Sequence, residues 1–263
     1  MLPLKKALKK VDREHPLAIK IRKQITQALA EFNMIAEGDQ VMICVSGGKD
    51  SSILMVLLEE IRKRAELNFT IEAVILDQKQ PGFQIDEFKA WFELEDLKLS
   101  VIQKDTYSIV TEKVTNGVFC SLCSKLRRAI LYDFAFAKGF NKMALGHHRD
   151  DVIETTLLNL FYVGQLSTMP AKLRSDDDRN TVIRPMVFVA EKDLIKLAVE
   201  WGFPVIPCNL CGSQEGMKRQ KMKKLIKDLE NDIPNLGASF TKALQNAKPS
   251  HLLDQKLFNF KDL

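Results

Sequence analysis

The sequence has 263 residues, 46% of them hydrophobic and 28% charged, and its net charge is +5 at pH 7. This length suits one large domain, or one domain with appendages, that can bury a substantial core. No apolar run is long enough to span a bilayer, and residues 1–10 lack the apolar segment of a signal peptide. We therefore expect a cytoplasmic protein without a membrane partner.

The positive charge is concentrated in two segments, one from Lys5 to Lys23 and one from Lys218 to Lys227. Blocks of Lys and Arg suit a polyanionic partner, because they neutralise phosphates and release counterions. The alternative interpretation is a solvated helical face, which needs no partner.

The predicted elements alternate between amphipathic helices and short apolar strands. Residues 4–33 predict one helix that is broken at Pro16, because proline interrupts the hydrogen bonding of a helix interior. A polar loop is expected from residue 164 to the last strand. Further helices are expected at 51–65, 85–97, 124–137, 152–163, 191–201 and 215–230, and strands at 41–45, 70–76, 100–102, 142–146 and 181–183.

Such alternation predicts the α/β fold class, with an open, mainly parallel sheet of about five strands and helices on both faces. We expect three parts in the chain. Residues 1–36 form a basic helical extension, residues 37–211 form the central α/β domain that also carries the paired cysteines, and residues 212–263 form a basic helical region.

The first strand, Val41 to Val45, is followed at once by Ser-Gly-Gly-Lys-Asp-Ser-Ser and a helix. A strand, a glycine turn and a helix bring bare backbone N–H groups and a helix dipole to one point, where a phosphate can bind. The spacing matches neither a Walker loop nor a dinucleotide fingerprint. Ser-Gly-Gly-Lys-Asp-Ser resembles the PP-loop of the ATP pyrophosphatases, which split ATP between its α and β phosphates and adenylate a substrate. An ordinary glycine turn is the alternative.

A second polar segment, Gly146-His147-His148-Arg149-Asp150-Asp151, follows the fourth predicted strand. Carboxylates there could hold Mg²⁺ against ATP phosphates or orient a substrate. Taken alone, the two aspartates could simply cap the next helix. Because parallel strands end at the same edge of the sheet, this segment and the glycine turn can face one nucleotide. The histidines are expected to hydrogen-bond or stack rather than to bind zinc, because neighbours at a strand end point apart.

Four of the five cysteines form two pairs, Cys120-x-x-Cys123 and Cys208-x-x-Cys211. Such pairs indicate a metal or redox chemistry rather than a disulfide framework. Zinc would take four thiolates, an iron–sulfur cluster can take three and leave one iron open, and a redox pair would use one Cys-x-x-Cys. The two pairs lie far apart in the sequence, whereas the cysteine pairs of a self-contained zinc module lie close together. The pattern therefore does not fit such a module. Cys44 lies inside the first strand and is expected to be a buried core residue.

Several further motifs occur in order along the chain and resemble the tRNA 2-thiocytidine biosynthesis family almost from end to end. They include Phe-Cys-Ser-Leu-Cys-Ser, Gly-His-His-Arg-Asp-Asp and Pro-Cys-Asn-Leu-Cys-Gly-Ser-Gln. The segments that carry the resemblance are 32–35, 46–51, 119–128, 146–151, 183–185, 191–193, 207–214, 249–252 and 257–260. Two departures are visible: Val189-Ala190 stands where the family has Cys-Arg, and Ala129 stands where it has Gly.

The resemblance implies a PP-loop fold and an enzyme that thiolates C2 of a cytidine at position 32, in the tRNA anticodon loop. Such an enzyme uses ATP, Mg²⁺ and a [4Fe-4S] cluster held by three cysteines, and its expected partners are tRNA and a cysteine desulfurase as sulfur donor. A homodimer is a further expectation. By position, the cluster ligands would be Cys120, Cys123 and Cys211, with Cys208 nearby as the competing third ligand.

The expected roles of the other residues follow from the motifs and the resemblance. The residues expected to take part in catalysis are Lys49, Asp50, Asp151 and Cys211. The residues expected to bind ATP are Ser46, Gly47, Gly48, Lys49, Asp50, Ser51, Ser52, Asp77, Gly146, His147 and Asp150. The residues expected to bind tRNA are Lys125, Arg127, Arg128, Lys218, Arg219 and Lys221.

Three other functions remain open at this point. A zinc-bearing PP-loop enzyme could act on tRNA as a uridine thiolase or a ligase. The fold could also serve as a non-catalytic nucleotide- or RNA-binding module. A simple redox Cys-x-x-Cys protein is the third alternative, and it would not need Lys49.

Overall fold

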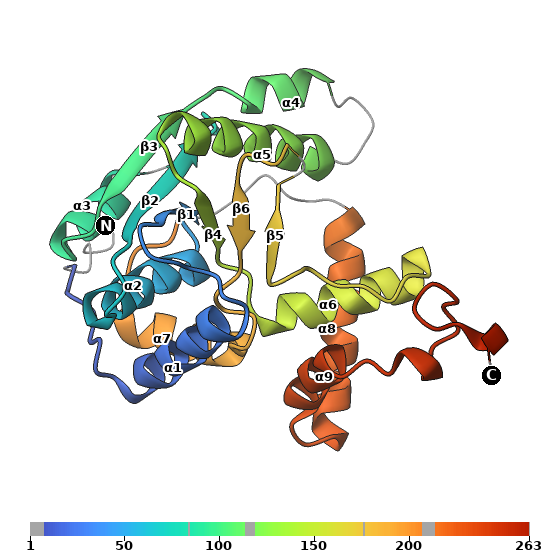
Figure 1. The fold of residues 1–263 in the computed structure, drawn as a ribbon. Helices are drawn as coiled ribbons and strands as arrows, with labels where there is room; N and C mark the ends of the chain where they lie inside the picture. Colours follow the sequence, from blue (N-terminus) through green and yellow to red (C-terminus); the bar gives the residue numbers. More distant parts are fainter. Residues whose placement is uncertain (1–7, 84, 114–118, 176, 207–213, 263) are drawn as a thin grey trace.

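The structure is a computed structural model that describes residues 8–83, 85–113, 119–175, 177–206 and 214–262 (Figure 1). Cys208 and Cys211 lie outside these residues, and Cys120 is described in its backbone only. None of the described helices combines the length and the apolar character needed to cross a membrane.

The described residues form one sheet of six strands in the order β3-β2-β1-β4-β6-β5 (Figure 1). The strands are β1 (Gln40–Val45), β2 (Thr70–Asp77), β3 (Leu99–Gln103), β4 (Lys142–Leu145), β5 (Lys172–Arg174) and β6 (Thr181–Ile183). All neighbours pair in parallel except β5, which runs antiparallel to β6. The open α/β class is confirmed, and the sheet gains one edge strand inside the segment that was expected to be a polar loop.

The helices are α1 (Pro16–Glu31), α2 (Lys49–Arg64), α3 (Asp86–Leu94), α4 (Tyr107–Lys113), α5 (Phe119–Ala137), α6 (Arg149–Leu158), α7 (Glu191–Trp201), α8 (Gln214–Asp232) and α9 (Leu236–Gln245). Shorter turns are the π-helix η1 (Asn159–Val163) and the 3-10 helices η2 (Pro249–His251) and η3 (Phe260–Asp262). The expected positions of α2, α3, α7 and α8 are confirmed within a few residues.

The N-terminal helix differs from the expectation of a helix broken at Pro16. Pro16 is the first residue of α1, and residues 8–15 are not helical. Proline suits this position because its missing N–H has no partner in the first turn of a helix. The ring of His15 accepts a hydrogen bond from the backbone N–H of Leu17 at 3.2 Å and caps the helix.

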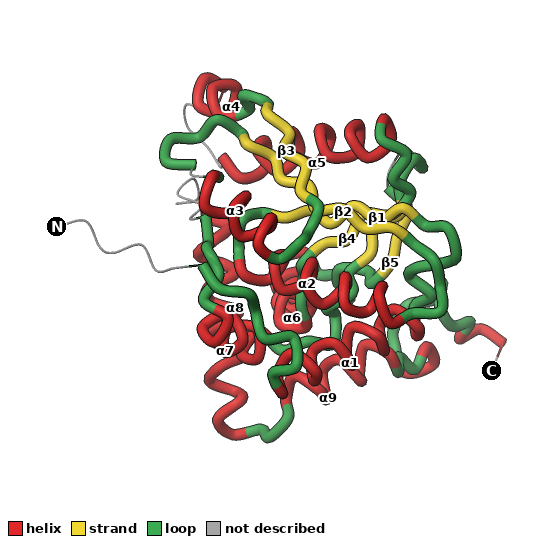
Figure 2. Tube along the Cα trace, turned by 90° about the vertical axis from the view of Figure 1, so that its left-hand side faces the viewer, coloured by secondary structure: helices red, strands yellow, loops and turns green. Residues whose placement is uncertain are grey.

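Helices cover both faces of the sheet, as expected (Figure 2). On one face, Ile43 and Val45 of β1 pack in a core with α1, α2, α3 and α7. On the other face, Met42 and Cys44 of the same strand pack against α5. Alternate residues of a strand point to opposite faces, so β1 is apolar throughout because it is covered on both sides.

The order in which the chain adds strands to the sheet changes direction at β1. From β1 it passes outward to β2 and β3, and then returns to place β4 on the other side of β1. In open α/β sheets, ligands bind in the crevice at the carboxyl ends of the two strands that flank such a switch point. The loops that follow β1 and β4 therefore define the place to look for a site.

Candidate functional site

The turn after β1 is held in a conformation that only glycine adopts easily. Gly47 has a φ of +81°, and a Cβ built on it would lie 2.7 Å from the Cβ of Ile206. The backbone N–H of Ile206 donates a hydrogen bond to the carbonyl of Gly47 at 2.9 Å. The turn is thus fixed by the segment that follows α7, and it requires a residue without a Cβ at position 47.

The hydroxyl groups of the turn take part in its own hydrogen bonding. Ser51 Oγ accepts a hydrogen bond from the backbone N–H of Ser46 at 3.1 Å. Ser52 is fully buried, and its Oγ donates to the carbonyl of Gly48 at 3.0 Å. Ser51 therefore faces the open side of the turn, whereas Ser52 stabilises it from inside the helix; binding of ATP by either hydroxyl stays a prediction.

Gly146 brings the end of β4 against the start of α2. A Cβ on Gly146 would lie 2.9 Å from the backbone nitrogen of Ser51. No larger residue fits there, because backbone atoms of a helix start cannot move aside as the end of a side chain can. The structure thus joins the two motifs that the sequence placed at one sheet edge.

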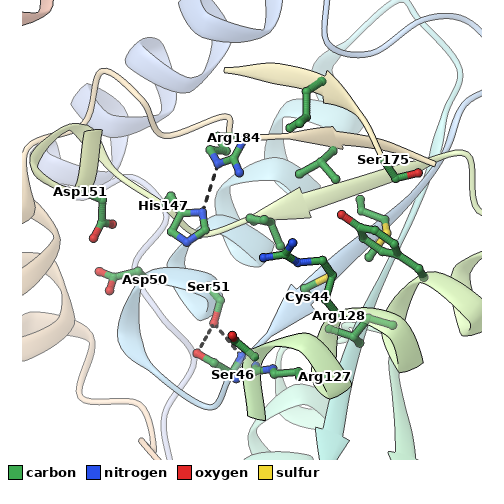
Figure 3. Close-up of a pocket in the computed structure, with 18 residues that line it drawn as sticks. Cys44, Ser46, Asp50, Ser51, Arg127, Arg128, His147, Asp151, Ser175 and Arg184 are labelled. Atoms are coloured by element: carbon green, nitrogen blue, oxygen red, sulfur yellow. Dashed lines mark hydrogen bonds between the residues drawn. The ribbon is translucent and has the colours of Figure 1, made fainter. Parts of the chain in front are cut away.

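A cavity of about 520 Å³ opens beside this contact (Figure 3). The turn, the end of β4, helix α5 and strands β5 and β6 contribute its walls. The polar lining residues are Ser46, Asp50, Ser51, Ser124, Arg127, Arg128, Tyr132, His147, Asp151, Ser175 and Arg184. Its volume lies within the range of about 300–1,000 Å³ that is typical of small-molecule and cofactor sites.

Two carboxylates, Asp50 and Asp151, line this cavity, and Figure 3 draws both on its left-hand side. Lys49 Nζ lies 3.0 Å from an Asp50 carboxylate oxygen. Among the described residues, no group of three or more His, Cys, Asp or Glu side chains is arranged to hold a metal ion. Mg²⁺ often needs only one or two carboxylates, since phosphate oxygens and water complete its shell, so the pair fits this ion with a nucleotide.

His147 lies in the cavity as a neutral ring. Burial lowers its pKa from 6.5 to about 4, and the charges of Arg184 and Arg219 act in the same direction, whereas Asp151 opposes them. Its Nδ1 accepts a hydrogen bond from Nε of Arg184 at 3.3 Å (Figure 3). Near neutral pH the proton of this ring therefore belongs on Nε2, where it can be donated to a ligand.

The neighbouring residues of the second motif have structural partners. Asp150 Oδ2 accepts a hydrogen bond from the backbone N–H of Glu191, the first residue of α7, at 2.7 Å. His148 and Asp151 form a reciprocal capping box at the start of α6. Asp77 accepts from the backbone N–H of Lys79 at 2.8 Å and is not among the cavity-lining residues. ATP contacts of Asp150 and Asp77 remain predictions.

A network of alternating charges lies next to the carboxylate pair, and three of its members were missed in the sequence. Glu154 is almost completely buried, and burial raises its pKa to about 7. Arg219 lies between Asp151 at 3.3 Å and Glu154 at 3.5 Å. Lys223 Nζ lies 3.7 Å from Glu154 Oε1 and 3.0 Å from Glu191 Oε1. Helical spacing could have indicated Glu154, because it lies three residues after Asp151 on one helix face.

The first cysteine pair begins α5, on the same side of the sheet as the cavity. Cys123 Sγ donates a hydrogen bond to Oε1 of Gln78, the residue after β2, at 3.2 Å. The adjacent Ser124 lines the cavity together with Ser46. The thiol of Cys44 also faces the cavity, but burial raises its pKa to about 12, so it behaves as an inert core residue.

The cations that were expected to bind tRNA lie on two helices. On α5, Arg127 and Arg128 line the cavity and Lys125 is exposed. On α8, Lys221 is exposed, and Lys218 Nζ lies 4.7 Å from the ring centre of Tyr162. Arg219 differs from the others because its guanidinium already pairs with two carboxylates of the site. All six roles in tRNA binding remain predictions.

Comparison with known proteins gives consistent results at the level of sequence and fold. Residues 17–204 match a PP-loop domain family. A protein of Bdellovibrio bacteriovorus called tRNA-cytidine(32) 2-sulfurtransferase is 63% identical over 96% of this chain and 98% of its own length. A protein of the same name from Tolumonas auensis is 50% identical over 93% of this chain and 81% of its own.

Among solved structures, the U34-tRNA thiolase of Methanococcus maripaludis, determined with its [4Fe-4S] cluster, has a similar fold. Its TM-score is 0.69 at 20% identity, over 89% of this chain and 80% of that one. At this identity the likeness concerns the fold alone. Because the sequence matches span nearly the whole chain, the chain belongs to the PP-loop domain family and, within it, to the family of the tRNA-cytidine(32) 2-sulfurtransferases.

Proposed function

We propose that this protein is an ATP-dependent tRNA thiolase that replaces the C2 oxygen of a cytidine at position 32 of the anticodon loop with sulfur. The observation that carries the proposal is one cavity lined both by the turn after β1 and by the helix that bears the first cysteine pair. Ser46 and Ser51 come from the turn, and Ser124, Arg127 and Arg128 come from α5. A nucleotide bound at the turn and a group bound by the cysteines can therefore both reach one base in this cavity.

The turn fits the triphosphate of ATP. Gly47 and Gly48 lie at the start of α2, where the helix dipole favours negative charge, and the backbone N–H of Gly48 donates to Ser46 Oγ at 3.3 Å. Lys49 adds an ammonium group beside them. Attack of the C2 oxygen on the α-phosphorus breaks the bond to the β-phosphate, and pyrophosphate leaves with the electron pair. These groups stabilise the negative charge that moves onto the pyrophosphate.

Asp50 and Asp151 are the proposed Mg²⁺ ligands, because both carboxylates line the cavity. The neutral His147 is placed to donate its Nε2 proton to the ligand, while Arg184 fixes the orientation of the ring.

The proposed [4Fe-4S] cluster would be held by Cys120, Cys123 and Cys211, of which only the Cys123 side chain is described. Its thiol lies at the carboxyl edge of the sheet, next to the cavity wall, which fits a cluster that faces an activated base. When bound, the cluster would supply sulfur at the sulfide level. AMP on the C2 oxygen makes that oxygen a good leaving group, so a sulfide could form a bond to C2 while the C2–oxygen bond breaks and AMP leaves with the oxygen and the electron pair.

Arg127 and Arg128 are placed to bind the phosphates that flank the target base, because they lie on α5 and line the cavity. An anticodon loop is single-stranded, so a base can leave its stack at modest cost and enter the site. A cytoplasmic location, a cysteine desulfurase as sulfur donor and a homodimer belong to the same proposal.

Release of pyrophosphate and AMP from ATP in the presence of tRNA tests the activation step. We expect release by the wild-type protein, at least a hundredfold slower release by Lys49→Ala, and no change in Lys98→Ala, whose exposed side chain lies near the opposite edge of the sheet. A protein with its cluster intact that releases no pyrophosphate on any tRNA would instead be a binding module.

A further inference from the structure

Helix α8 is fixed against the site by its apolar face. Its Met222 and Ile226 are buried against Ile153 and Leu157 of α6. This packing turns Arg219 and Lys223, which are one helical turn apart, toward α6 and the start of α7. The basic helix therefore presents one part of its charge to the proposed ATP site and another part to solvent.

Lys223 and Lys49 meet at a single carboxylate oxygen. Lys223 Nζ lies 3.0 Å from Glu191 Oε1, and Lys49 Nζ lies 3.7 Å from the same atom. Glu191 is the first residue of α7, and its backbone N–H is held by Asp150. Two ammonium groups that are far apart in the sequence thus lie near one carboxylate oxygen beside the glycine turn.

The buried Glu154 explains why Lys223 occupies this position. Its carboxylate is 1% exposed, and its Oε2 accepts no hydrogen bond among the described residues. Burying a carboxylate at this depth is costly, and Arg219 Nε at 3.5 Å from Oε2 and Lys223 Nζ at 3.7 Å from Oε1 offset that cost. Lys223 nevertheless keeps 45% of its side chain exposed, so its ammonium group can still reach a ligand.

We propose that Lys223 is a second lysine that binds the β- and γ-phosphates of ATP, positioned by Glu154 and Glu191 opposite Lys49. The inference rests on the proposed function and adds α8 to the nucleotide site. A triphosphate placed over the turn brings more negative charge than the single carboxylate of Glu191. Both ammonium groups then have a better partner, and each hydrogen bond to a phosphate oxygen is charge-assisted.

The arrangement also assigns different tasks to the cations of α8. Arg219 is held by Asp151 and Glu154, and it neutralises the buried end of the network. Lys223 is the member that can exchange a carboxylate for a phosphate. Lys218 and Lys221 remain on the solvent side for tRNA.

Calorimetric binding of two ligands to the full-length protein, without tRNA, tests this inference. The ligands are AMP, which lacks the β- and γ-phosphates, and α,β-methylene-ATP, whose scissile bridge cannot break. We expect Lys223→Ala to weaken the triphosphate analogue about tenfold and to leave AMP unchanged, because the lost contact is to the outer phosphates. Lys223→Arg restores most of the affinity, since it keeps the charge.

Lys224→Ala is the matched control, because Lys224 is the exposed next residue of the same helix, and it should bind both ligands like the wild type. An unchanged affinity of Lys223→Ala for the analogue contradicts the inference. An equal loss of AMP affinity also contradicts it, because that result indicates a distorted site. A wild-type protein that binds neither ligand contradicts the proposed function itself.

Discussion

Gly47 combines two requirements that no other residue type meets in this turn. Its φ is +81°, and its missing Cβ leaves room for Ile206. Gly82 has a nearly equal φ of +79°, but none of the described residues has an atom within 4 Å of a Cβ built on it. A comparison of alanine substitutions at Gly47 and Gly82 therefore separates the free-energy cost of a left-handed backbone from the cost of a steric contact.

We predict that Gly82→Ala destabilises the protein by about 1 kcal/mol, through its backbone alone. Gly47→Ala should cost a further 1–3 kcal/mol, roughly, and should abolish ATP binding, because Ile206 and the turn must move apart. Denaturant unfolding and calorimetry measure the two effects. Equal losses in the two variants would show that the contact with Ile206 is unimportant.

The buried carboxyl of Glu154 makes stability depend on pH. Its pKa is about 7 in the folded protein, above the ordinary value of 4.5, mainly because of burial. Below the lower value it is neutral in both states. As the pH rises from 4.5 towards 7 the unfolded chain ionises first, so the folded state loses stability across this window and does not regain it at higher pH.

Glu154→Gln removes this dependence, because the amide stays neutral. We predict that the unfolding free energy of the variant minus that of the wild type rises by up to about 3 kcal/mol between about pH 4 and about pH 8. Denaturant titrations at several pH values give this difference directly. A difference that is flat with pH would mean that Glu154 ionises normally in the folded protein.

At the scale of elements, α7 begins where Asp150 accepts the backbone N–H of Glu191 at 2.7 Å. Ala190, which precedes the helix, has no side chain to cap it. Asp150→Ala should therefore lower the unfolding free energy by about 1–2 kcal/mol, as the loss of a helix cap does. Asp150→Asn should lower it less, because the amide keeps an acceptor oxygen. Identical losses in the two variants would argue against a capping role.

Helix α5 links the cavity to the expected path of tRNA. We predict that Arg127→Ala and Arg128→Ala each weaken tRNA binding several-fold, and that each lowers the slope of log affinity against log salt by about one, because one phosphate contact is lost. Lys138→Ala, just beyond the other end of this helix, should change neither quantity. Filter binding at several salt concentrations measures both. A slope that does not change would place the RNA elsewhere.

At the scale of the whole molecule, the open parallel sheet was predictable because its central strands are short apolar runs bounded by turns. The segment from Val41 to Val45 is buried on both faces of the sheet, and its apolar run predicts a strand from the sequence alone. The strand β5 was not predictable, because Lys172-Leu173-Arg174 is polar and becomes a strand only by pairing with β6. Edge strands carry little apolar pattern.

The site was predictable to the extent that its parts lie within contiguous motifs. The glycine turn and Gly146 are brought together by the order of the strands, as the motifs implied. The pairing of Lys223 with Glu154 and Glu191 was not, because it joins three helices that only the fold brings close. Sequence patterns reveal local chemistry, whereas long-range ion pairs become visible only in the folded structure.

The central claim is that one cavity brings an ATP-activated cytidine to the sulfur source. Mass analysis of tRNA nucleosides from cells that lack this protein, complemented with wild type or with Lys49→Ala, tests it most directly. We predict that 2-thiocytidine is absent without the protein, returns with the wild type and does not return with the variant. Unchanged 2-thiocytidine in cells without the protein, or full restoration by Lys49→Ala, would contradict the account.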